Sequence, residues 1–176
     1  GLKSYMKQVI QSRRSGKLAL KEVPAPVVKA GHLLVETRAS LISVGTERMA
    51  IEFAKQGLIG KARARPDLVK QVIEKAKRGG FRTTFETVMA RLYEPLPLGY
   101  SASGVVKSVG AGLEGDFHVG ERVAMAGAGM ANHAEYNVVP RNLVASIPEG
   151  VSNDAAAFGT VGAIALHAVR NAKPAI

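Results

Sequence analysis

The stretch "EPLPLGYSASGVVKSVGAG", residues 94–112, decides the fold class of this chain. It leaves a helical pattern at Pro95, runs through the β-branched segment "SGVVKSV" and stops at paired glycines. Short β-branched runs with partial alternation, bounded by glycine and proline, indicate strands joined by tight turns. The same pattern recurs in "HLLVETRASLISV", "ERVAM" and "HAEYNVVP". Regions 6–46 and 98–149 therefore predict a compact β-barrel or a strongly bent sheet.

The segment between these two regions has a helical period. In "RPDLVKQVIEKAKRGG" the apolar residues share one helical face, between Pro66 at the start and Gly79-Gly80 at the end. "TTFETVMARLYEP" follows with a capping box at Thr83-x-x-Glu86 and an apolar stripe, so we expect its aromatic residues to be buried. A further helix is expected in "TERMAIEFAKQG". These patterns predict a helical insertion at about residues 47–95.

The last part of the chain, residues 151–176, begins with "SNDAAAFGTVGAIALHAVRNA". Ser152 is placed to cap a helix there. The run is apolar almost all round, so we expect the helix to be buried. A domain that ends on a buried helix has usually lost its neighbour, and we interpret the chain as a fragment. Residues 1–5, ahead of Met6, are interpreted as an expression scar.

Composition excludes several classes of protein. The chain has 176 residues, 47% of them hydrophobic, which is typical of a globular protein. It has no cysteine, which excludes disulfides and thiolate-bound metals and fits a cytoplasmic protein. No apolar run approaches the roughly 20 residues that span a bilayer, so we expect no membrane association.

The net charge of +10 is concentrated in the insertion. Residues 47–94 contain 11 Lys/Arg and 6 Asp/Glu, which is half of the excess. Such a charge attracts anionic partners in general. We expect no nucleic-acid binding, because no recognised motif is present and the aromatic residues of the insertion lie on faces predicted to be buried.

Four motifs in a fixed order carry a family resemblance: "ISVGTE" (42–47), "GYSASGVV" (99–106), "FHVGERV" (117–123) and "AEYNVVP" (134–140). Together they resemble the medium-chain dehydrogenase/reductase superfamily, which includes zinc alcohol dehydrogenases and zinc-free quinone reductases. The basic insertion and "AGAGMANHAEYNVVP" are similar to one branch, the bacterial bi-domain oxidoreductases fused to a Gfo/Idh/MocA-type domain.

The resemblance implies an α+β, mainly β fold. Residues 6–150 would form a GroES-like β-barrel domain that is interrupted by the basic helical insertion at about 47–95. The helix in 151–176 would lead into a Rossmann domain that this chain does not contain. That domain would be the chain's own partner and would hold most of the NAD or NADP, with Thr160 as a contact from this side. "GAGLEG", residues 110–115, precedes a strand rather than a helix and therefore lacks the context of a dinucleotide fingerprint.

The resemblance also places the zinc ligands of related enzymes at Val44, Tyr100 and Thr160. None of these is a usual zinc ligand, so we expect no zinc and no other metal site. The loss of zinc does not exclude hydride transfer, because a hydroxyl donor can stabilise the charge on the substrate oxygen in place of a metal. By resemblance Thr46 would relay the proton and the Tyr100 phenol would lie near the lost histidine position. The alternatives are that Thr46 is a helix N-cap and that Tyr100 only fills the emptied pocket.

Other candidate residues have equally plain alternatives. Glu47 occupies the place of the family's Asp, or it is a first-turn helix residue favoured by the dipole. His133 acts as an acid or base, or it lies in a surface turn. Lys61, Arg63 and Arg65 attract an anionic substrate, or they belong to the solvated face of a helical hairpin.

The sequence predicts the catalytic half of a zinc-independent, NAD(P)-dependent oxidoreductase, inactive as a fragment. Its small-molecule substrate would be a carbonyl, alcohol or enone, of anionic or sugar-derived character. The alternative is a non-catalytic docking module that uses the basic helical insertion. Substrate, direction, NAD versus NADP and homo-oligomerisation are left open.

Overall fold

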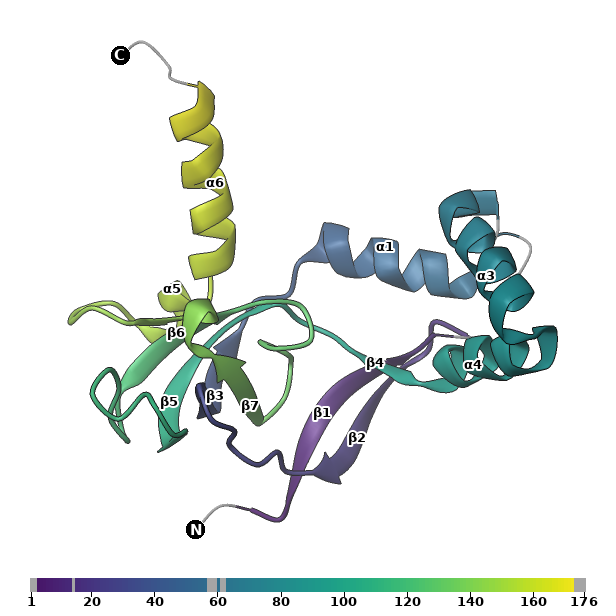
Figure 1. The fold of residues 1–176 in the computed structure, drawn as a ribbon. Helices are drawn as coiled ribbons and strands as arrows, with labels where there is room; N and C mark the ends of the chain where they lie inside the picture. The colour runs from purple at the N-terminus through teal and green to yellow at the C-terminus, as the bar shows by residue number, and fades with distance from the viewer. Residues whose placement is uncertain (1–2, 14, 57–59, 61–62, 173–176) are drawn as a thin grey trace. The chain divides into compact units, whose positions relative to one another are not determined.

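A computed structural model describes residues 3–13, 15–56, 60 and 63–172 (Figure 1). Within these residues the chain forms two compact units. The first is rich in strands and the second in helices. The first unit comprises Gly1–Val9, Leu20–Ser43 and Pro97–Ile176, and the second comprises Ile10–Ala19 and Val44–Leu96.

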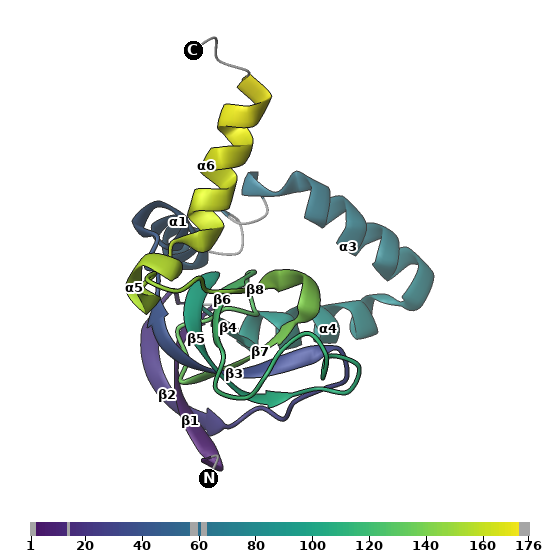
Figure 2. The same cartoon turned by 90° about the vertical axis from the view of Figure 1, so that its left-hand side faces the viewer.

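The first unit is built on a five-stranded antiparallel sheet with the order β7-β3-β5-β6-β8. Figure 2 shows these strands from a second side. The predicted β segments are thereby confirmed. The strands are β3 (His32–Ser40), β5 (Ser101–Val109), β6 (Arg122–Ala126), β7 (Tyr136–Pro140) and β8 (Val144–Ser146), with a 3-10 turn η1 (Arg141–Leu143) before β8.

A second sheet has the order β2-β1-β4, from β1 (Tyr5–Ser12), β2 (Leu18–Pro24) and β4 (Pro95–Pro97). Within the first unit, β1 meets the segment before β7 through a bridge between Gln8 and Ala134. The Glu135 carboxylate accepts hydrogen bonds from the Lys7 amide at 2.7 Å and from Lys3 Nζ at 2.9 Å. The residues interpreted as a scar thus include Lys3, which pairs with Glu135, and Tyr5, which begins β1.

The first unit has two hydrophobic clusters: Leu34 belongs to the smaller one, and Leu33 and Val35, on the opposite face of β3, belong to the larger one. Leu33, Val35 and Val106 have no exposed surface, as expected for alternate positions on paired central strands. Burial of such side chains is the main stabilising term in folding. The larger cluster contains Leu33, Val35, Ala102, Val106, Leu113, Phe117, Val123, Met125, Ala131, Val139 and Val144.

One glycine permits the central strands to approach each other. Gly104 on β5 pairs with Thr37 on β3. A Cβ at Gly104 would lie 2.2 Å from the carbonyl oxygen of Glu36, which no real contact allows. The glycine of "SASGVV" is therefore required for the pairing of β3 with β5.

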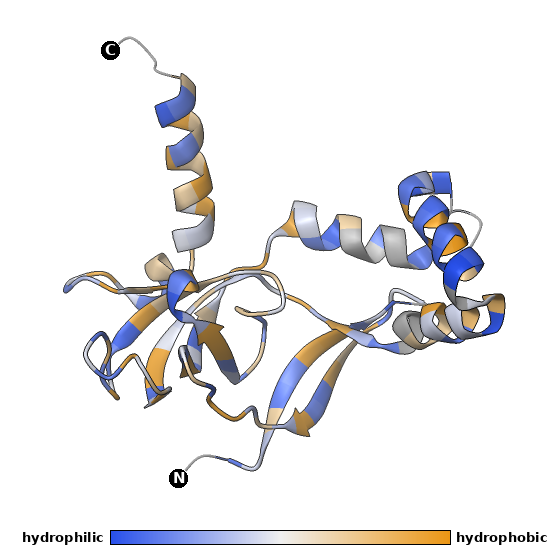
Figure 3. Ribbon diagram, in the orientation of Figure 1, coloured by the Kyte–Doolittle hydropathy of each residue, from blue (hydrophilic) through white to orange (hydrophobic). Residues whose placement is uncertain are grey.

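Two helices end the first unit. Helix α5 (Asn153–Ala156) is capped as predicted, because Ser152 Oγ accepts the amide of Ala155 at 3.1 Å. The expected burial of the following helix, α6 (Gly159–Ala172), is wrong: none of its residues is buried, and Ile164 is 62% exposed. Its start contacts β5 and β6, and the rest projects away from the strands in both views (Figures 1 and 2). The apolar residues along this helix, orange in Figure 3, are exposed, among them Leu166 at 49% and Val169 at 55%.

The helical segments predicted for the insertion are confirmed in the second unit. They are α1 (Val44–Lys55), α3 (Pro66–Gly79) and α4 (Phe81–Tyr93). The predicted capping box is wrong, because α4 begins at Phe81 and Thr83 lies inside its first turn. In the described part of the chain, no helix combines the length and the hydropathy needed to cross a bilayer.

The hairpin of α3 and α4 buries different side chains from those expected. Ala76 on α3 and Thr84 on α4 are buried, whereas Phe81 is 74% and Phe85 66% exposed. The expectation that these aromatic residues are buried is therefore wrong. Thr84 lies about 100° round the helix from Phe85, so the face of α4 that is buried against its neighbour is not the aromatic face.

Candidate active site

The segment "GYSAS" places two buried hydroxyl groups at the start of β5. Ser101 and Ser103 are fully buried and, two residues apart on a strand, point to the same face. Ser101 Oγ donates to the carbonyl oxygen of Ala157 at 2.6 Å, and Ser103 Oγ donates to that of Asn153 at 2.7 Å. Buried hydroxyls need such acceptors. The two serines therefore connect β5 to the α5–α6 segment.

The structure brings together Tyr100 and Thr160, two of the three positions that the family resemblance assigns to zinc ligands. The amide of Thr160 donates to Ser101 Oγ at 3.3 Å. The Thr160 hydroxyl lies 3.5 Å from the carbonyl oxygen of Tyr100, a long contact. That carbonyl also accepts the amide of Gly127 at 2.8 Å. The backbone of Tyr100 is thus fixed by two separate segments, and its side chain is half-buried.

His133 lies next to the residues that precede Tyr100. Its amide donates to the carbonyl oxygen of Leu98 at 2.8 Å. Gly99 has a φ of +101° and approaches so closely that a Cβ there would lie 2.8 Å from the nitrogen of His133. Any other residue at Gly99 would be strained and would also clash with the backbone. Gly99 therefore allows the backbone just before Tyr100 to contact the backbone of His133.

The imidazole of His133 shares a hydrogen bond with a residue that the sequence did not indicate. Its Nδ1 lies 2.8 Å from Ser40 Oγ, at the end of β3. Ser40 pairs with Ala102 on β5, and the following amide, of Leu41, donates to the carbonyl oxygen of Ser101 at 2.9 Å. His133 lies in a bend of the chain and is partly buried, and its role as an acid or base stays a prediction. A serine at the ring nitrogen fixes the orientation of the imidazole.

The remaining predicted catalytic residues belong to the second unit. Thr46 is the third residue of α1 and is exposed, so the interpretation of Thr46 as an N-cap is wrong. Glu47 lies in the first turn, where the helix dipole favours a carboxylate. The predicted roles of Thr46 as a proton relay and of the Tyr100 phenol near the lost histidine position stay predictions.

The basic cluster is only partly described. Lys61 lies outside the described residues. Arg63 is exposed, and Arg65 forms an ion pair with Asp67 at 2.9 Å. The hydrogen bond from Arg65 holds the pKa of the Asp67 carboxyl below its usual value. Because this carboxylate competes for the guanidinium, Arg65 is a weaker anion binder than the sequence suggests.

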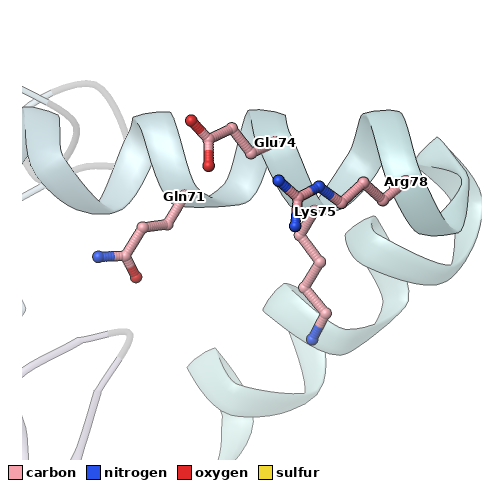
Figure 4. A pocket seen from close by; sticks show the side chains of 4 residues that line it. All are labelled: Gln71, Glu74, Lys75 and Arg78. Atoms are coloured by element: carbon pink, nitrogen blue, oxygen red, sulfur yellow. The ribbon is translucent and has the colours of Figure 1, made fainter.

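The second unit also has an open, shallow hollow of about 390 Å³ on α3. Its lining side chains are Gln71, Glu74, Lys75 and Arg78 (Figure 4). All four are exposed and the charged ones are of both signs, so water and salt screen any ligand contact.

Among the residues that the structure describes, no group of three His, Asp or Glu side chains could hold a metal ion. Residues 110–115 follow β5 in a turn, and no helix begins there. This turn therefore lacks the helix N-terminus of a dinucleotide-binding turn.

No family model matches the chain, and no curated protein matches its sequence. Solved structures do match. A quinone oxidoreductase from Coxiella burnetii aligns with 96% of this chain at 20% identity and a TM-score of 0.64, over 45% of its own chain. A short chain alcohol dehydrogenase from Escherichia coli CFT073, solved with NADH, aligns with 98% at 21% identity and a TM-score of 0.66, over 47%. A mycobacterial protein solved with NADPH aligns with 97% at 20% identity and a TM-score of 0.62, over 41%.

These likenesses show the fold. It is the fold that the matching parts of these oxidoreductases share, and it agrees with the GroES-like fold that the family resemblance implied. The chain spans less than half of the length of each of these proteins.

Sequence reasoning missed Ser40, Ser101 and Ser103. The signal for the last two was present: serines at alternate positions of a strand share one face, and if that face is buried their hydroxyls need acceptors on a covering element. Ser40 carried no such signal, because its contact with His133 joins residues 93 positions apart.

Proposed function

We propose that this chain is the substrate-binding half of a zinc-independent, NAD(P)-dependent oxidoreductase. The observation that carries the proposal is the fold, which matches a quinone oxidoreductase and an alcohol dehydrogenase over nearly all of this chain. Nicotinamide use is supported by the NADPH and NADH complexes of two of the matching proteins. The fusion to a Gfo/Idh/MocA-type domain remains part of the proposal.

The reaction would be the interconversion of a carbonyl and an alcohol, or the reduction of an enone. In an enzyme of this class the hydride comes from the nicotinamide. When a carbonyl carbon gains a hydride, its oxygen gains negative charge and must receive a proton. The task of this chain is to bind the substrate, steady that charge and exchange that proton.

Tyr100 and His133 are the residues we propose for this task. A phenol donates a hydrogen bond to a developing oxyanion, and an imidazole exchanges a proton near neutral pH. Their touching backbone segments and the bond from Ser40 to the imidazole support a common site. Thr46 is proposed as a further proton relay. Arg63 and Arg65 are proposed to attract an anionic substrate.

A second candidate function uses the second unit as a docking module. Phe81 and Phe85 favour it, because large aromatic side chains exposed on one helical face are typical of contact surfaces. The basic charge of the insertion would select an acidic partner surface. Phe85→Gln would then weaken capture of that partner and leave nicotinamide binding unchanged.

The test is a fluorescence titration of the intact protein with NADH and with NADPH, followed by steady-state kinetics on carbonyls and enones. We expect saturable binding of one nucleotide. Tyr100→Phe, His133→Gln and Thr46→Val should each slow turnover by about tenfold or more. The matched controls are Tyr5→Phe and His118→Gln, which change exposed side chains of the same types. Binding of neither nucleotide at millimolar concentration would refute the proposal, and unchanged rates would leave the three residues as packing groups.

A further inference from the structure

The start of α6 is held by a side chain from a strand far away in sequence. Amides in the first turn of a helix have no intrahelical acceptor, and a side-chain oxygen usually satisfies one of them. Thr160 is the second residue of α6, and its amide donates to Ser101 Oγ at 3.3 Å. The cap therefore comes from β5, 59 residues earlier, rather than from the residue before the helix.

The same hydroxyl also holds the turn that precedes α6. Ser101 Oγ accepts from Thr160 and donates to the carbonyl oxygen of Ala157 at 2.6 Å, so its single proton and one lone pair are both engaged. Ala157 lies in the break between α5 and α6, and Thr160 lies in the first turn of α6. The buried Ser101 hydroxyl therefore binds backbone groups on both sides of Gly159, the first residue of α6.

Ser103 provides a comparison within the same strand. It is equally buried and on the same face, and its hydroxyl donates to Asn153 at the start of α5. Arg122 donates to the carbonyl oxygen of Val151, again before α5. These contacts hold the start of α5, whereas Ser101 accepts a hydrogen bond from α6.

We propose that Ser101 is the cap that orients α6 on the β-rich unit and thereby positions the nicotinamide-binding half against Tyr100. The second part rests on the proposed function. Ser101 is adjacent to Tyr100, and the Thr160 hydroxyl contacts the carbonyl oxygen of Tyr100. A change in the direction of α6 would therefore be felt at the proposed substrate site. Misplacement by about 1 Å can lower a rate about 100-fold, so a helix angle is a sensitive quantity.

The first measurement is hydrogen exchange with mass spectrometry on the intact protein carrying Ser101→Ala, Ser103→Ala or neither. Loss of a cap should speed exchange in peptides that cover residues 157–166 by about tenfold in Ser101→Ala. In Ser103→Ala the exchange rate of these peptides should be the same as in the unchanged protein. Equal exchange at 157–166 in Ser101→Ala and the unchanged protein would overturn the proposal, whatever the protein's activity.

The second measurement is kinetic and uses the same proteins. Ser101→Ala should lower kcat by about tenfold and leave the NADPH dissociation constant unchanged, because the nucleotide would be held by the other half. Ser103→Ala removes an equally buried hydroxyl and should lower kcat less than twofold. Equal kinetic losses in both variants would reduce Ser101 to general stability and overturn its positioning role. If the unchanged protein neither binds a nucleotide nor turns over, the proposed function fails, and the exchange result alone decides the capping of α6.

Discussion

The two units of this chain bury their side chains in opposite ways. In the core of the strand-rich unit Leu33, Val35 and Val106 have no exposed surface, and Ser101 and Ser103 on β5 are buried and hydrogen-bonded. In the helical unit the hairpin of α3 and α4 buries Ala76 and Thr84, whereas the large apolar residue Phe85 faces solvent.

This difference indicates that the strand-rich unit specifies its own structure. A sheet whose inner face is closed by its own residues reaches dense packing without help. A helical hairpin that leaves its aromatic face open has apolar surface available for another contact. The fold is therefore decided by the strand-rich unit.

The largest effect is expected from Gly104→Val. The added side chain would meet the backbone of Glu36 at 2.2 Å, and the backbone cannot move without breaking the pairing of β3 with β5. We expect no folded protein by circular dichroism. Gly115→Val, where a Cβ meets nothing within 4 Å, is the control and should fold. A folded Gly104→Val protein would show that this pairing is not what holds the unit.

A smaller loss is expected from Leu33→Ala, which opens a cavity in the core of the strand-rich unit. The cost should be about 2–5 kcal/mol in urea unfolding. Ile73→Ala on α3 is the control, because Ile73 is already half-exposed, and it should cost clearly less. Equal costs would remove the contrast between the two units.

The ion pairs of the two units should differ in the same direction, but their contributions to stability are smaller. Hydrogen bonds from Lys3 and the Lys7 amide hold the pKa of the Glu135 carboxyl below its usual value. The carboxylate therefore stabilises the folded state above the unfolded pKa of about 4.3, and this stability is lost as the pH falls through the lowered folded value. Thermal unfolding should separate Glu135→Gln from the unchanged protein at pH 7, and the gap should shrink below about pH 4.

Glu86→Gln is the matched control for this titration. It removes a carboxylate from an exposed pair with Arg82 on α4, and such pairs contribute little. Its effect at pH 7 should be smaller than that of Glu135→Gln. A gap for Glu135→Gln that grows on acidification would contradict the assigned direction of the pKa.

The smallest effect is expected from Phe85→Gln. Because the ring is 66% exposed and glutamine is a good helix former, the free energy of unfolding should change by less than about 0.5 kcal/mol. Chemical denaturation measures this directly. A loss above about 2 kcal/mol would mean that Phe85 is buried in solution and that the helical unit has a core of its own.

The strands could be predicted from sequence because their signal is local. "SGVVKSV" and "HAEYNVVP" carry alternation and turn residues that no distant contact overrides. The same holds for Ser152, whose cap is formed with a residue three positions later.

Burial of helices could not be predicted in this way, because a helix surface is buried only if a partner is present. Ile164 and Phe85 have the apolar spacing of buried residues, and the described chain supplies nothing to cover them. Thr46 failed as an N-cap because helix ends are uncertain by one or two residues. Of the candidate site, Tyr100 was predicted from a motif and His133 from its titratable side chain, whereas Ser40 depends on a tertiary contact that the sequence does not show.

The most direct test of the proposed oxidoreductase is transfer of a label. The intact protein would be incubated with NADH or NADPH deuterated at C4 and a panel of ketones, aldehydes and enones, and the products would be weighed by mass spectrometry. The proposal predicts that at least one product carries the deuterium on carbon and that Tyr100→Phe forms it about tenfold more slowly. Nucleotide left unconsumed with every member of the panel would contradict it.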